Sequence, residues 1–139
     1  MKKLLLISLS ALLLPACSDR NQFEQAVLEQ IQLEKASENA NKDYKISPER
    51  MAKCVVDTVS NNMPGIFALD PNRLMAYRNY TKMLTLSSSK DPKKTLEELR
   101  VDFGSPKELA EAHANYTESQ MDCLSALIGE SEGAAKEEK

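Results

Sequence analysis

Four dipeptides in this chain place a helix-capping side chain directly before proline, and they constrain the fold more than any other feature. They are Ser47-Pro48, Asp70-Pro71, Asp91-Pro92 and Ser105-Pro106. The capping oxygen accepts hydrogen bonds from the amides of the first helical turn, where proline also loses nothing by lacking an N–H. Each dipeptide therefore predicts the start of a helix. Glu108 strengthens the last start, because it completes a capping box with Ser105.

These starts predict helices near residues 48–62, 71–87, 92–102 and 106–128, and apolar spacing adds one near 21–42. No segment from residue 20 onward alternates apolar and polar residues as a half-buried strand would. We therefore expect an all-α fold, a small bundle of about four to five helices.

Two of these helices have informative apolar patterns. In the last helix, apolar spacing predicts a core-facing surface that includes the single histidine of the chain; the residues are Leu109, Ala112, His113, Tyr116, Cys123, Leu124 and Leu127. In the first helix, Phe23, Val27 and Ile31 share a side, but the sequence becomes polar after Leu33. Its second half is typical of an exposed tether.

The first sixteen residues have the layout of an export signal. Lys2 and Lys3 precede an apolar run over residues 4–14, and Ala16 supplies a small residue before a cleavage point. The run is too short for a stable transmembrane helix, which needs about 20 residues. We therefore expect residues 1–16 to be a signal peptide that is removed.

The segment Leu14-Pro15-Ala16-Cys17 resembles the lipobox of bacterial lipoproteins, although Pro15 departs from the small or branched residue usual at its position. The resemblance implies cleavage before Cys17 and lipid attachment to that cysteine. Several acyl chains would anchor the protein durably to a membrane. Ser18 follows the cysteine where retained inner-membrane lipoproteins typically carry Asp, so the resemblance also implies the outer membrane, on its periplasmic face.

An ordinary signal-peptidase cut after Ser18 is the alternative, because Ala16-Cys17-Ser18 also has the small-x-small pattern. That cut would discard Cys17 and release a soluble periplasmic protein.

The two remaining cysteines, Cys54 and Cys123, are an even pair in a compartment where disulfides persist, so we expect them to be bonded. The predicted layout is a signal peptide at 1–16, a lipidated N-terminus with amphipathic helix and tether at 17–46, and a helical domain at 47–129. Residues 130–139 are mostly Glu, Lys, Ala and Gly, a composition that predicts a disordered charged tail.

Composition excludes several classes of function. Without its first sixteen residues the chain has 16 basic and 21 acidic side chains, a formal charge of −5. Nucleic acid is therefore not an expected partner, because phosphate binding needs clustered Lys and Arg. One histidine and two paired cysteines predict no metal site, and His113 is the single histidine available as a base for a nucleophilic Ser or Cys. We expect no enzyme and no cofactor.

The segment from Met63 to Leu69 is unusually apolar for a connection between helices. Ile66, Phe67 and Leu69 could fold inward and close one end of the bundle. Alternatively, the segment joins the outward side of the third helix in a patch that binds a protein or lipid partner; the patch residues are Met63, Ile66, Phe67, Leu69, Met75, Met83 and Leu86.

The function expected from these features is that of a non-enzymatic lipoprotein that binds or supports another envelope protein. The alternative is a soluble periplasmic stress or chaperone-like protein in which His113 responds to acidification. The sequence names neither the partner nor the oligomeric state.

Overall fold

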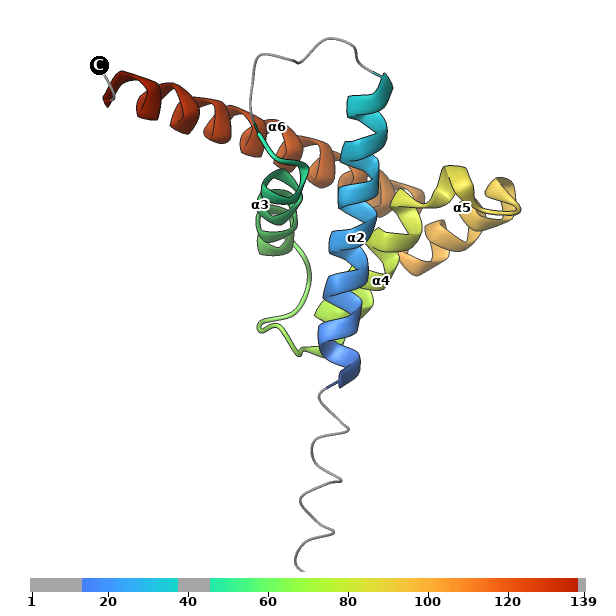
Figure 1. Ribbon diagram of the computed structural model, residues 1–139. Coiled ribbons are helices and arrows are strands. Elements are labelled where there is room, and N and C mark those ends of the chain that lie inside the picture. The colour runs from blue at the N-terminus through green and yellow to red at the C-terminus, as the bar shows by residue number, and fades with distance from the viewer. Residues whose placement is uncertain (1–13, 38–45, 138–139) are drawn as a thin grey trace, which may run out of the picture.

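The computed structural model describes residues 14–37 and 46–137, with side chains described for residues 18–34 and 46–133. It confirms the all-α fold, with five α-helices and no strand in these ranges. The helices are α2 (Leu14–Ser37), α3 (Pro48–Asn61), α4 (Pro71–Leu84), α5 (Pro92–Asp102) and α6 (Pro106–Glu137), with a 3₁₀ turn at Leu86–Ser88 (Figure 1).

The predicted caps set the helix starts. The side chains of Ser47, Asp70 and Asp91 each accept a hydrogen bond from a first-turn amide, and proline occupies the first turn of α3, α4 and α5. Ser105 Oγ accepts from the amide of Glu108 at 3.1 Å at the start of α6. Four helices therefore begin at the residues that the sequence predicts.

The core lies where α2 packs against both α3 and α4, and α6 closes the bundle across α3. Phe23, Val27, Val55, Val59 and Leu99 are fully excluded from solvent. Phe23 also contacts the rings of two α4 tyrosines, with centroids 5.8 Å and 5.7 Å apart. Helix α2 is therefore a core element.

This packing corrects the predicted boundary at residue 47, because the helical domain includes α2. The predicted amphipathic side of α2 lies in this core through Phe23, Val27 and Ile31, whereas Leu33 and Glu34, where the predicted tether begins, are exposed. Residues 38–45, which completed the predicted tether, lie outside the described residues.

At the other end, α6 continues as helix to Glu137. This corrects the predicted disordered tail over 130–139 as far as residue 137. Glu, Ala and Lys are good helix formers, and extending an existing helix costs far less than starting one. Residues 138 and 139 lie outside the described residues, as do residues 1–13 of the predicted signal peptide.

Candidate functional site

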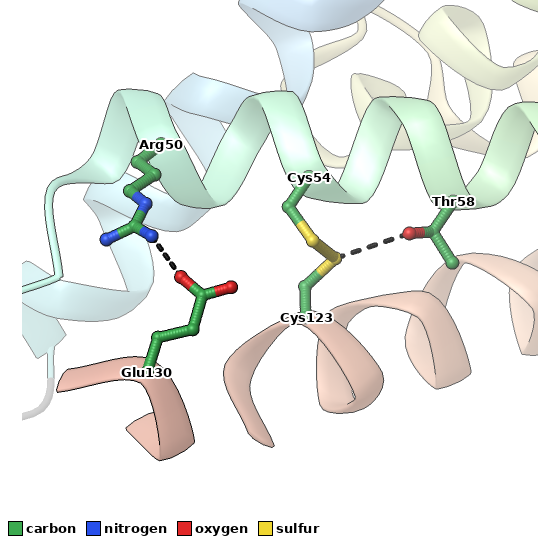
Figure 2. Close-up of a disulfide and its surroundings, with 5 residues drawn as sticks. All are labelled: Arg50, Cys54, Thr58, Cys123 and Glu130. Carbon is green, nitrogen blue, oxygen red and sulfur yellow. Dashed lines mark hydrogen bonds and ion pairs between the residues drawn. A yellow bond between two sulfur atoms is a disulfide. The ribbon is translucent and has the colours of Figure 1, made fainter. Parts of the chain in front are cut away.

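A disulfide joins Cys54 of α3 to Cys123 of α6, confirming the predicted pair (Figure 2). The Thr58 hydroxyl lies 3.4 Å from the Cys123 sulfur and must be the donor, because a disulfide sulfur carries no proton. One turn away on α3, Arg50 forms an ion pair with Glu130 of α6. The disulfide therefore fixes α3 and α6 side by side over a 69-residue sequence separation.

The connection between α3 and α4 exposes three of its apolar side chains. Ile66 is 94% exposed, Phe67 61% and Leu69 47%. The inward-folding interpretation of this segment is therefore wrong, and the outward one holds for these three residues. We call them the apolar loop.

The other four predicted patch residues do not form one surface with the apolar loop. Met63 and Met83 are buried in the core, which corrects their predicted place in an exposed patch. Met83 faces inward because it shares a helical side with Ala76 and Tyr80, which are also buried. Leu86 packs partly against the core, and Met75 is exposed on α4.

Arg73 of α4 holds the apolar loop in place. Its guanidinium donates to the carbonyl oxygens of Pro64 at 2.9 Å, Gly65 at 2.7 Å and Met63 at 3.2 Å. It also donates to Ser60 O at the end of α3. A planar guanidinium can reach several acceptors at once, so one side chain fixes the backbone from α3 through the turn.

Asp70 secures the other end of the apolar loop. Its carboxylate accepts from the amide of Ile66 at 3.1 Å and from that of Asn72 at 2.9 Å. These two hydrogen bonds, the Ile66 one foremost, lower the pKa of Asp70 below its ordinary value of 3.8. The same side chain therefore caps α4 and shapes the loop.

A groove of about 570 Å³ lies beside this connection, between α4, the end of α5 and α6. Its apolar lining includes Met75, Ala76, Phe103 and Ala112. Met75 thus belongs to the groove and not to the apolar loop.

Fixed amides form the polar wall of the groove. Asn115 of α6 donates to Tyr80 Oη at 3.1 Å and to Val59 O at 3.2 Å, and it accepts from Asn62 at 2.8 Å. Burial raises the pKa of Tyr80, so its hydroxyl keeps its proton at neutral pH. The sequence does not predict this network, because its hydrogen-bonded partners are 35 to 56 residues apart. They lie in or next to three different helices, so no local sequence pattern connects them.

Carboxylates line the groove along α6. Glu111 pairs with Lys107 at 3.2 Å, and Asp102 of α5 pairs with Lys82 at 2.8 Å. Glu108 and Glu118 have no ion-pair partner within residues 18–34 and 46–133. The groove lining contains four acidic side chains and no Lys or Arg.

His113 is exposed, which corrects its predicted place in the core. Helix α6 buries Ala112, Tyr116, Cys123 and Leu127. Because consecutive helix positions differ by about 100°, His113 points away from the side defined by Ala112. It borders a shallow hollow with Leu86 and Leu109.

Within the described part of the chain, no group of three or more His, Cys, Asp and Glu residues is arranged to hold a metal ion. Within residues 14–37 and 46–137, every helix is too short or too polar to span a bilayer. The side chain of Cys17, the predicted lipid-attachment residue, lies outside the described side chains, although its backbone is in the first turn of α2.

The chain was compared with protein-family models, curated protein sequences and solved structures, and it matches none of them.

Proposed function

We propose that this protein is a non-enzymatic lipoprotein, anchored through Cys17 to the periplasmic face of the outer membrane, that binds another envelope protein. The anchor rests on the lipobox-like segment. The binding role rests on one structural observation, the groove between α4, α5 and α6, whose polar wall is already ordered.

The groove chemistry suits a particular kind of partner segment. Met75, Phe103 and Ala112 supply apolar contact area, while Glu108 and Glu118 add negative charge without a compensating cation in the groove lining. A segment with apolar residues beside Lys or Arg would satisfy both features, and its charge would mainly favour association rate and specificity. Because Asn115 is already hydrogen-bonded to Tyr80 and Asn62, the polar wall of the groove would lose little conformational entropy when a partner binds.

Site-specific photocrosslinking in living cells tests this proposal. A crosslinking amino acid replaces Met75 in the groove or, as a control, Leu33, which is 63% exposed on α2. We expect a reproducible crosslinked protein from position 75 that is absent from position 33. Identical products from both positions would contradict the groove as the binding site.

A charge reversal in the groove, with a matched control on the same helix, tests the electrostatic part of the proposal. Glu118→Lys places a cation in the groove, whereas Glu132→Lys makes the same change at an exposed α6 position outside it. We expect Glu118→Lys to weaken the affinity of the purified partner by about tenfold or more, with Glu132→Lys near wild type. Equal affinities for the two variants would contradict the electrostatic part of the proposal.

A further inference from the structure

The apolar loop is a folded feature of the surface. Ile66, Phe67 and Leu69 lie within four consecutive positions, all about half exposed or more. Arg73 and Asp70 fix the backbone that leads into the apolar loop, because Arg73 donates to Pro64 O and Gly65 O and Asp70 accepts from the amide of Ile66. A contiguous apolar surface fixed in this way is typical of an interaction site.

The apolar loop lies at the same end of the molecule as residue 17. Helices α2 and α3 run in opposite directions, and the start of α2 and the α3–α4 connection both lie at the lower end of the view (Figure 1). Arg20 of α2 is 2.6 Å from Asp57 of α3. Residue 17 is three positions before Arg20 in α2, and the last residue of α3 is four positions after Asp57. Because the two helices are antiparallel, residue 17 and the end of α3 both lie about 5 to 6 Å from this salt bridge in the same direction along the helix axes.

Almost no chain separates residue 17 from the core. The backbone at residue 17 is already helical, and Phe23, only six positions after Cys17, is fully buried. Acyl chains on Cys17 would therefore hold this end of the bundle at the bilayer surface, with no tether to let it move away.

We infer that the apolar loop inserts into the bilayer beside the acyl chains, an inference that rests on the lipid anchor in the proposed function. An interfacial amphipathic helix buries its apolar face about 5 to 10 Å into the boundary between headgroups and acyl chains, and the apolar loop would enter the same boundary. A protein partner that covered the apolar loop would have to fit between the helical bundle and the bilayer in which the bundle is anchored.

The charges at this end permit close contact with phospholipid headgroups. Asp19 pairs with Arg78 at 2.9 Å, and Asp57 pairs with Arg20. The arginines therefore offset the repulsion that these carboxylates would feel from anionic lipids.

Tryptophan fluorescence tests the insertion directly, because the chain contains no tryptophan and any introduced one is the sole reporter. The full chain, extracted with its native N-terminus, is reconstituted into phosphatidylethanolamine and phosphatidylglycerol vesicles that contain brominated phosphatidylcholine. Phe67→Trp reports on the apolar loop, and Leu33→Trp is the control, with similar exposed fractions of 61% and 63%. Leu33 lies 16 positions after Cys17, about 24 Å farther along α2.

We expect blue-shifted emission from Phe67→Trp, with quenching by brominated lipid about twofold or greater, and solvent-like, weakly quenched emission from Leu33→Trp. Adding Ile66→Asp to Phe67→Trp should abolish the quenching, while circular dichroism shows that the chain remains helical. Solvent-like emission from Phe67→Trp on an acylated chain would overturn the inference alone. Intact mass of the same sample reports on the anchor separately, and a chain without acyl mass would overturn both the anchor and the inference.

Discussion

Arg73 of α4 and Gly65 of the preceding loop fix each other's conformation. The arginine donates to Gly65 O at 2.7 Å, and Gly65 has a φ of +97°. A Cβ on Gly65 would lie 2.8 Å from Arg73 Cβ. The turn that exposes Ile66 and Phe67 therefore depends on a glycine at this position.

Gly65→Ala should destabilise the protein by about 1 to 3 kcal/mol, because it adds both backbone strain and a steric clash. Gly129→Ala is the matched control, since a Cβ there meets open space on α6. That change should stabilise the helix by about 0.5 to 1 kcal/mol. Urea denaturation of both variants measures the difference, and equal stabilities would refute this role for Gly65.

Truncating the fully buried Phe23 tests whether α2 belongs to the domain. Phe23→Ala should lower the free energy of unfolding by about 3 to 5 kcal/mol, since it removes a core ring and leaves a cavity. Leu33→Ala, at a largely exposed position on the same helix, should change it by no more than about 0.5 kcal/mol. Similar small effects from both variants would mean that α2 is not part of the folded domain.

How much of this fold the sequence predicts depends on how local each signal is. The starts of α3, α4, α5 and α6 follow from a capping oxygen and an adjacent proline, so four dipeptides suffice to place them. The disulfide follows from the number of cysteines and the inferred compartment. Neither prediction requires knowing which helices pack together.

The inward or outward direction of individual side chains could not be predicted in the same way. Met63 and Ile66 are both apolar, yet the backbone turn at Gly65 separates a buried side chain from an exposed one. His113 adjoins the buried Ala112 in sequence but faces solvent, because the side of α6 that packs is set by α3 and the disulfide. The groove depends still more on tertiary structure, since Asn62, Tyr80 and Asn115 meet only in the folded bundle.

Loss of the disulfide should be costly. Replacing Cys54 and Cys123 together with Ser should lower the free energy of unfolding by about 4 kcal/mol under the loop-closure account, given the 69-residue separation. Denaturation of the wild type with and without a reducing agent provides the same comparison without substitution. A loss below about 1 kcal/mol would show that α3 and α6 pack equally well without the covalent link.

The lowered pKa of Asp70 predicts a defined pH dependence. A carboxyl group whose pKa is lower in the folded state than in the unfolded state stabilises the fold above its unfolded pKa. This contribution is lost as the pH falls from about 4 through the folded pKa. Asp70→Asn should therefore be less stable than wild type at pH 6, and the difference should shrink toward pH 3. A difference that does not change over this range would contradict the role assigned to the carboxylate.

The central claim, a helical module anchored through Cys17, is tested most directly by intact mass spectrometry of the protein extracted from the cell envelope. The account predicts a chain that begins at Cys17 and carries acyl mass, found in the outer-membrane fraction and lost on Cys17→Ser substitution. An unacylated chain that begins at Asp19 and is found in the soluble periplasmic fraction would contradict it.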